Sequence, residues 1–369
     1  MRKRIFLLAV TLLLCTALPS YAAGPETAAA TKNTGSPYYV MVNRRAAAVT
    51  VYGLDDAGFY SIPVRAMVCS TGRAGFDTPP GAFTVSNRAA WMYMVDGSYG
   101  QYATRFNGAI LFHSVCYNRR DPSTLMTYEY NMLGGYASRG CVRLQTADAK
   151  WVFDNLPAGT KVVVYDADSP GPLGKPDTLV TRISDTQNNG WDPTDPRPEN
   201  PWRSVLGDKA GTSSAYLGMP FKDVRAVDPF YSQVLAVYRA GLMAGTDGTH
   251  FSPQKYLTYA QAQILARNVG NKVHSAANTD TSQPSFPGST LALPLPEGAA
   301  PQDPVPRSVF ALYLWAAKNQ TPSGPADPYD CTGSGAIKTD LATLLAGLPV
   351  SAPLTRAEAA AMLSGSAAL

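Results

Sequence analysis

The sequence Ser138-Arg139-Gly140-Cys141-Val142-Arg143-Leu144 carries the strongest chemical signal in this chain of 369 residues. A cysteine acts as a nucleophile when it is accessible and lies beside a cationic or basic group that favours its thiolate. Cys141 stands between two arginines and follows Gly140, whose missing side chain lets a ligand approach the backbone closely. Backbone N–H groups around Gly140 and Cys141 are therefore candidates for stabilising an oxyanion.

A nucleophilic thiol needs a base. His113 follows a short apolar run and precedes Ser114, whereas His250 and His274 occur far along the chain, in its helical part. We therefore expect His113 to accept the proton of Cys141 and Ser114 to orient the second ring nitrogen. Two other interpretations remain open at this point: Cys141 as half of a disulfide, and His113 as a packed core residue.

Short runs of β-branched and aromatic residues, bounded by turn residues, predict strands around this pair. The runs lie at residues 38–42, 48–52, 63–68, 82–85, 109–112 and 161–165. Their regular spacing is typical of a β-sandwich or barrel. One helix is expected from Thr146, as N-cap, to about Leu156. The expected fold class is mainly β with one or two short helices, followed by a small α-helical C-terminal module.

Four motifs in order resemble the L,D-transpeptidase catalytic domain of bacterial cell-wall enzymes. They are Val68-Cys69-Ser70-Thr71-Gly72, Thr78-Pro79-Pro80-Gly81-Ala82-Phe83, Ile110-Leu111-Phe112-His113-Ser114 and the stretch at 138–144. The resemblance covers about residues 37–166 and implies a mixed β-sandwich. In that family a Cys attacks the L,D peptide bond before the terminal D-Ala of a tetrapeptide stem. D-Ala leaves, and an amine of a neighbouring stem then resolves the thioester.

Carried over residue by residue, the resemblance makes Cys141 the nucleophile, His113 the general base and acid, Ser114 its orienting neighbour and Gly140 part of the oxyanion hole. We expect four further residues to bind substrate: Arg139, Arg143, Ser138 and Tyr102. Arg143 would contact a substrate carboxylate, and Tyr102 would stack on substrate. No metal or organic cofactor is implied.

Two departures from the family pattern matter. Arg139 stands where the family usually has His, and its permanent charge is expected to lower the pKa of the Cys141 thiol. His113 and Cys141 are 28 positions apart, longer than usual, so residues 117–130 are expected to form a longer lid or a variable surface insertion. Cys69 and Cys116 form a disulfide beside this lid or remain free, and the state of Cys331 is open.

The C-terminal part resembles S-layer homology repeats, which are helical and bind anionic wall polymers. The resemblance rests on Phe221-Lys222-Asp223-Val224, Gly241-Leu242-Met243-Ala244-Gly245 and Phe251-Ser252-Pro253, and on Leu354-Thr355-Arg356-Ala357-Glu358-Ala359. Capping boxes open two helices, at Thr258 and at Thr355. Arg356 is the expected polymer-binding cation. The alternative is a degenerate module used only for packing or spacing.

The N-terminus combines Met-Arg-Lys-Arg, an apolar run of about 14 residues and a small-x-small site, which predicts a secretory signal peptide. The expected order is signal peptide 1–22, flexible leader 23–36, catalytic domain 37–168, Pro-rich linker or tail 169–215, helical repeat 216–274, Pro-rich linker 275–307 and degenerate second repeat 308–369. An acidic group in the tail, Asp192, Asp195 and Glu199, is expected to be a solvated loop rather than a cation site.

Together these features predict an exported, wall-associated cysteine acyltransferase acting on peptidoglycan stem peptides, with a wall polymer as a second partner. The net charge of +4 argues against a nucleic-acid binder. Two alternatives share the same residues. Transfer of the acyl group to water would make an L,D-carboxypeptidase or endopeptidase, and loss of catalysis would leave a wall-binding protein.

Overall fold

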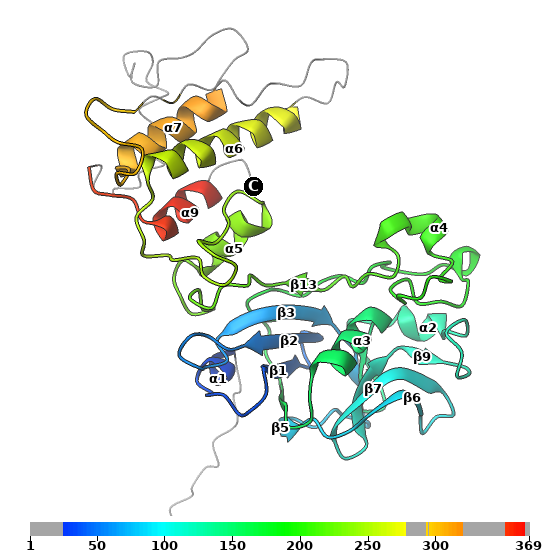
Figure 1. Ribbon diagram of the computed structural model, residues 1–369. Coiled ribbons are helices and arrows are strands. Elements are labelled where there is room, and N and C mark those ends of the chain that lie inside the picture. Colours follow the sequence, from blue (N-terminus) through cyan, green and yellow to red (C-terminus); the bar gives the residue numbers. More distant parts are fainter. Residues whose placement is uncertain (1–24, 278–292, 294, 320–350, 366–369) are drawn as a thin grey trace, which may run out of the picture.

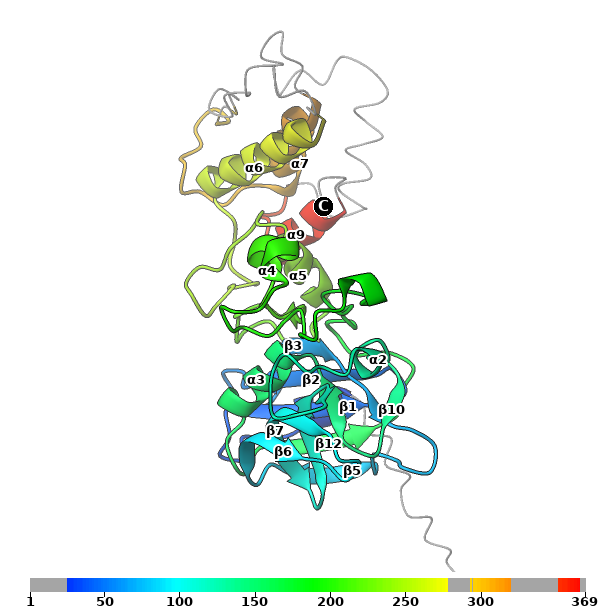
Figure 2. The ribbon, with the colours of Figure 1, turned by 90° about the vertical axis from the view of Figure 1, so that its right-hand side faces the viewer.

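The structure is a computed structural model that describes residues 25–277, 293, 295–319 and 351–365. The expected signal peptide over 1–22, Cys331 and about half of the second Pro-rich stretch lie outside these residues. Figures 1 and 2 show a β-rich part, which extends to β13 at residues 216–217, and a helical part above it. The predicted fold class is confirmed.

The larger sheet has the strand order β13-β3-β2-β1-β12-β5. Its strands are β1 (Tyr38–Asn43), β2 (Ala48–Gly53), β3 (Ile62–Val68), β5 (Gly81–Thr84), β12 (Lys161–Tyr165) and β13 (Tyr216–Leu217). β2 is antiparallel to both β1 and β3, whereas β12 runs parallel to β1. All the strand runs expected from the sequence up to residue 85 thus meet in one sheet.

The second sheet has the order β11-β8-β7-β6, with β9 paired to β7. Its strands are β6 (Arg88–Tyr93), β7 (Tyr99–Asn107), β8 (Ile110–Ser114), β9 (Cys116–Tyr117) and β11 (Val142–Leu144). A short pair, β4 (Thr71–Gly72) and β10 (Tyr136–Ser138), lies beside it. Buried residues of both sheets and of helix α3 (Thr146–Asn155) share one core: Val40, Val51, Phe112, Val142, Leu144, Val152 and their neighbours.

Residues 25–36, expected to be a flexible leader, pack on the large sheet instead. Helix α1 (Pro25–Ala29) places Ala28, which has no exposed surface, in a cluster with Tyr39, Tyr52 and Tyr60. The Tyr60 hydroxyl donates to the Ser36 carbonyl at 2.6 Å. This segment is ordered because the sheet presents a tyrosine-rich face that the short helix covers.

Residues 169–215 form an ordered tail that crosses the small sheet, one of the two alternatives expected. Trp202, 1% exposed, lies before helix α4 (Arg203–Leu206) in a cluster with Val115, Tyr117 and Tyr130. Two short helical turns, η1 (Asp185–Gln187) and η2 (Gly207–Lys209), also belong to the tail. The tail ends in β13, which extends the large sheet next to β3.

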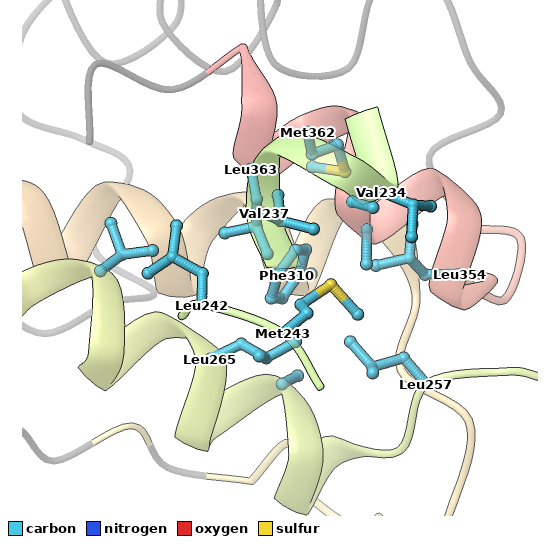
Figure 3. Close-up of a cluster of buried hydrophobic side chains, with 14 of the residues drawn as sticks. Val234, Val237, Leu242, Met243, Leu257, Leu265, Phe310, Leu354, Met362 and Leu363 are labelled. Atoms are coloured by element: carbon cyan, nitrogen blue, oxygen red, sulfur yellow. The ribbon is translucent and has the colours of Figure 1, made fainter. Parts of the chain in front are cut away.

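The helical part is built from α5 (Tyr231–Arg239), α6 (Tyr259–Ala277), α7 (Arg307–Asn319) and α9 (Arg356–Ser364). Figure 3 shows their apolar side chains meeting in one core, with Phe310 of α7 among side chains of the other helices. Both expected capping boxes are present: Thr258 with Gln261, and Thr355 with Glu358. Ala66 and Leu173 of the β-rich part join the same core, so the two parts pack against each other.

Three helix starts in this part are related by a ring of backbone hydrogen bonds. The Leu257 N–H donates to Leu354, Leu354 to Val305 and Val305 back to Leu257, at 2.8–2.9 Å. Each of these residues lies two before the first residue of α6, α7 or α9. α7 begins at Arg307, one residue before the expected start of the second repeat, and α7 and α9 have two separate, equivalent starts.

Candidate active site

Cys141 and His113 come from neighbouring strands. β8 and β11 pair in parallel, with Val142 opposite Phe112 and Arg143 opposite His113. Phe112 and Val142 point into the core between the sheets. Because side chains alternate along a strand, Arg143 and His113 lie on the opposite face. Cys141 stands two residues before Arg143, directly before β11, and the same alternation places it on that face. The predicted nucleophile and base therefore share one face of the small sheet.

The Cys141 side chain is partly exposed and is a free thiol. Its Sγ lies 3.9 Å from the Ala109 carbonyl oxygen. Burial raises the pKa of the thiol, although a backbone hydrogen bond from Leu111 and the positive charge of Arg143 act in the opposite direction. The resting group is thus a thiol, and it needs a base to become a nucleophile.

His113 is 2% exposed. Burial lowers the pKa of its imidazole to about 3, and the charge of Arg143 adds to this effect. A neutral imidazole at physiological pH is the form that can accept a proton. Its Nδ1 has no hydrogen-bond partner among the described residues.

The Ser114 hydroxyl is turned away from His113. It donates to the Val115 carbonyl at 2.7 Å and accepts from the Gln101 N–H at 2.8 Å. The side chain is turned to β7 because alternation along β8 points it away from the face that carries His113. The backbone of Ser114, by contrast, is hydrogen-bonded to His113, and this contact raises the pKa of the imidazole against the larger lowering caused by burial.

Gly100 of β7 gives the imidazole its space, and sequence reasoning missed it. A Cβ at this position would lie 2.6 Å from Nδ1 of His113 and 2.6 Å from Cε of Met94. Only a glycine leaves room for the ring at this position. A glycine inside a strand often marks a position where another group approaches the backbone closely. The stretch Tyr99-Gly100-Gln101-Tyr102 contained that signal.

The loop before Cys141 is fixed by hydrogen bonds. Gly140 has a positive φ of 110°, and its N–H donates to Ser138 Oγ at 3.1 Å. Ser138 Oγ in turn donates to the Cys141 carbonyl at 2.6 Å, and Thr78 Oγ1 donates to the Gly140 carbonyl at 2.8 Å. The Gly140 N–H is therefore occupied, and Ser138, which is buried, shapes the loop instead of facing substrate.

Arg143, expected to contact a substrate carboxylate, is instead buried in an ion pair inside the fold. It is 4% exposed and forms an ion pair with Glu129 of helix α2 (Thr127–Tyr130). The buried guanidinium needs this carboxylate, because an unpaired charge is costly away from water. Arg139, by contrast, is exposed, with its guanidinium 5.7 Å from the centre of the Phe76 ring.

Tyr102 is on the wrong side of the sheet to stack on a substrate at Cys141. Its ring packs edge-on against Phe153 of α3, 5.8 Å between centroids, and adjoins the core between the sheets. Cys69 and Cys116 are buried free thiols, so the disulfide alternative is not realised. Within the described parts of the chain, no group of His, Cys, Asp and Glu side chains is placed to hold a metal ion.

The expected lid over residues 117–130 is held down by the tail. The Leu125 N–H donates to the Gly190 carbonyl at 2.7 Å, and Thr127 Oγ1 donates to Asn188 at 2.7 Å. Asn131 exchanges two hydrogen bonds with the backbone of Ile183. Between the two segments lies an open pocket of about 480 Å³ lined by residues that include Tyr128, Arg182 and Asp185.

Asp192 and Asp195 of the tail are buried, where a solvated loop was expected, whereas Glu199 is exposed. Asp192 has no exposed surface, and its carboxylate accepts from the N–H and the hydroxyl of Thr146, both at 3.0 Å. Thr194 Oγ1 accepts from the Ala147 N–H at 3.0 Å. Side chains of the tail therefore cap the N-terminus of α3. Thr146, expected to be the N-cap, is instead the first residue of the helix, and Gln145 occupies the N-cap position.

Arg356, the expected polymer-binding cation, is 7% exposed. Its guanidinium donates to the Phe251 carbonyl at 2.8 Å and to the Ala244 carbonyl at 2.6 Å, and lies over the Phe251 ring. This arginine joins two segments of the helical part and is not available to an external anion. Sequence alone did not reveal this, because both acceptors are more than 100 residues away.

Comparison with known protein families assigns both parts of the chain. Residues 37–164 match the YkuD family model, described as the L,D-transpeptidase catalytic domain, and residues 220–262 match the S-layer homology domain. The chain carries both domains. The suspected domain arrangement is thereby confirmed.

Individual relatives match shorter parts. A stretch of 91 residues is 40% identical to a Bacillus subtilis (strain 168) protein named "Putative L,D-transpeptidase YciB", covering 24% of this chain and 46% of that protein. The chain thus spans about half the length of this curated relative.

Solved structures that match include an L,D-transpeptidase from Mycobacterium smegmatis, at 22% identity and a TM-score of 0.29, covering 36% of this chain and 60% of that one. Another is a fused Zn-dependent amidase/peptidase/peptidoglycan-binding domain-containing protein from Clostridium acetobutylicum ATCC 824. It shows 24% identity and a TM-score of 0.29, with 38% of this chain and 57% of that chain covered. In the described residues, no helix combines the length and apolar character needed to cross a membrane.

Proposed function

We propose that the L,D-transpeptidase domain catalyses acyl transfer between peptidoglycan stem peptides through a thioester on Cys141. The observation that carries the proposal is the placement of Cys141 and His113 on one face of paired parallel strands, within the matched family segment. His113 accepts the thiol proton as Sγ attacks the carbonyl carbon of the L,D peptide bond. The tetrahedral intermediate collapses, and D-Ala leaves with the proton from His113.

The second half of the reaction reverses these roles. An amine of a neighbouring stem attacks the thioester carbonyl and gives its proton to His113, and the thiol of Cys141 is restored. Burial raises the pKa of the Cys141 thiol and lowers the pKa of the His113 imidazole, so both groups are neutral at rest. The proton is therefore transferred to His113 as Sγ attacks, and no thiolate–imidazolium pair is formed beforehand. Water as acceptor would give carboxypeptidase or endopeptidase products from the same acyl-enzyme.

We further propose that the protein is exported and that its S-layer homology domain retains it at the wall by binding a polymer. The family match of residues 220–262 supports this role. Arg356 is not the contact in this proposal, because its guanidinium is used inside the fold. A comparison of pelleting with isolated walls, between the full chain and a chain ending after residue 219, tests the retention. Equal pelleting of both would exclude a binding role for the helical part.

The decisive experiment for catalysis is intact-mass analysis after incubation with a carbapenem, whose ring-opened acyl group stays on the nucleophile. We expect one adduct on the wild-type chain and none on Cys141→Ala. Incubation with tetrapeptide stems then separates dimer formation from release of a tripeptide. A free Cys141 thiol with no adduct would refute the proposed acyl-enzyme and favour the inactive wall-binding alternative.

A further inference from the structure

A buried ion pair connects the lid to the strand that follows the nucleophile. Glu129 lies in α2, within the segment between β9 and β10, and its carboxylate accepts from the Arg143 guanidinium. The side chains of Glu129 and Arg143 are 14% and 4% exposed. The motif around Cys141 does not include residue 129, because this acid lies in the longer segment between His113 and Cys141.

Arg143 is the charged neighbour that the catalytic pair shares. It lies opposite His113 in the ladder between β8 and β11 and two residues after Cys141 on the same face. Its guanidinium also donates to the Ala137 carbonyl at 3.5 Å, and its Nε has no hydrogen-bond partner among the described residues, so Glu129 supplies the charged contact that holds the guanidinium. Any movement of Glu129 therefore moves a positive charge beside both reacting side chains.

We propose that Glu129 is a positioning residue that holds the Arg143 guanidinium beside Cys141 and His113 and balances its charge. This inference rests on the proposed function of that pair. The Arg143 cation favours a thiolate at Cys141 but opposes a positive charge on His113. The Glu129 carboxylate offsets part of the repulsion between the Arg143 cation and a protonated His113, so that His113 can accept the proton that Cys141 loses.

Other titratable and charged groups also lie near Cys141 and His113, and the substitutions used to test the proposal leave them unchanged. Asp96, in the turn between β6 and β7, acts on both His113 and Cys141, and Arg105 of β7 acts on Cys141. The Cys116 thiol of β9 faces Arg143, Asp96 and Glu129. Their contributions are common to all variants, so a difference between variants reports the ion pair.

The test measures the pH dependence of Cys141 alkylation by iodoacetamide in the full-length protein, with the modified peptide identified by mass. In Glu129→Gln the Arg143 cation is no longer balanced, and we expect the midpoint to fall by about 0.5–1 pH unit. Acylation by a carbapenem should slow by about tenfold, because His113 accepts a proton less readily. Glu129→Asp should restore both values in part, and Glu199→Gln, at an exposed position of the tail, should match the wild type.

A paired variant keeps the test decisive if Glu129→Gln does not fold. Glu129→Gln with Arg143→Gln removes both buried charges, which proteins tolerate better than one unpaired charge. Without the cation the alkylation midpoint should move above that of the wild type. Midpoints equal to the wild type in both variants would overturn the positioning role, even if rates were lower. Failure of the wild type to form a carbapenem adduct would instead refute the proposed function, and the alkylation midpoints would still report the ion pair.

Discussion

Substitution of Gly100 by Ala tests the packing that orients the base. The added Cβ would lie 2.6 Å from Nδ1 and 3.0 Å from Cγ of His113, whereas ordinary contact begins at 3.4 Å. The ring must therefore move by about 0.8 Å. Met94 Cε, also 2.6 Å away, is the end of a flexible side chain and moves more easily. The imidazole, 2% exposed, has little space on its other side.

A displacement close to 1 Å at a reacting group costs on the order of 100-fold in rate. We expect Gly100→Ala to acylate about 100-fold more slowly with a carbapenem under single-turnover conditions, followed by intact mass. Overpacking should also lower the free energy of unfolding by about 1–3 kcal/mol in a urea titration. Gly135→Ala is the matched control, because a Cβ there meets no atom within 4 Å. Acylation of Gly100→Ala at the wild-type rate would refute the placement of His113 against this strand.

Three further predictions concern the tail, helix α3 and the helical part. Asp192→Ala should destabilise the catalytic domain by about 1–3 kcal/mol in urea, since Thr146 loses buried partners for its N–H and hydroxyl; an unchanged midpoint would contradict the external cap. Burial raises the pKa of Asp148 from 3.8 to about 6, so its protonated form is favoured in the folded state. The stability that this group contributes is full below about pH 3.8 and is lost as the pH rises through about 6; Asp148→Asn should flatten that part of the stability profile in urea melts between pH 3.5 and 7. Arg356→Ala should lower the stability of the helical part by about 2–4 kcal/mol, because two buried hydrogen bonds from a charged group are lost. If this variant unfolds like the wild type but no longer pellets with walls, Arg356 is a polymer contact after all.

The features that the sequence predicted best are local. The strand runs and the two capping boxes are each contained in fewer than ten consecutive residues, and the structure confirms them. The juxtaposition of Cys141 and His113 required one long-range step, the parallel pairing of β8 and β11. The ordered motifs of the family resemblance supplied that step. The catalytic roles of the two residues stay predictions.

The partners of the site could not be predicted in the same way. Glu129, Gly100 and Asp192 act on residues 13–46 positions away. Nothing in the neighbouring sequence distinguishes the two acids from ordinary surface acids, and the glycine inside a strand does not reveal which side chain lies against it. Arg143 was predicted to bind a substrate carboxylate and Arg356 a wall polymer, because arginine is a good hydrogen-bond donor to anions. Both are instead bound within the fold, by a carboxylate and by backbone carbonyl groups of other segments.

The ring of hydrogen bonds among Leu257, Val305 and Leu354 has a consequence for how the helical part can vary. In an open stack of repeats, a unit can be gained or lost at either end, and the remainder still has its neighbours. A closed ring has no end: deletion of any one of the three segments leaves an unpaired N–H and an unpaired carbonyl on the other two. Insertions between the helices do not break it, because the ring depends only on where the helices begin. This part of the chain is therefore expected to tolerate changes in loop length freely and changes in repeat number hardly at all.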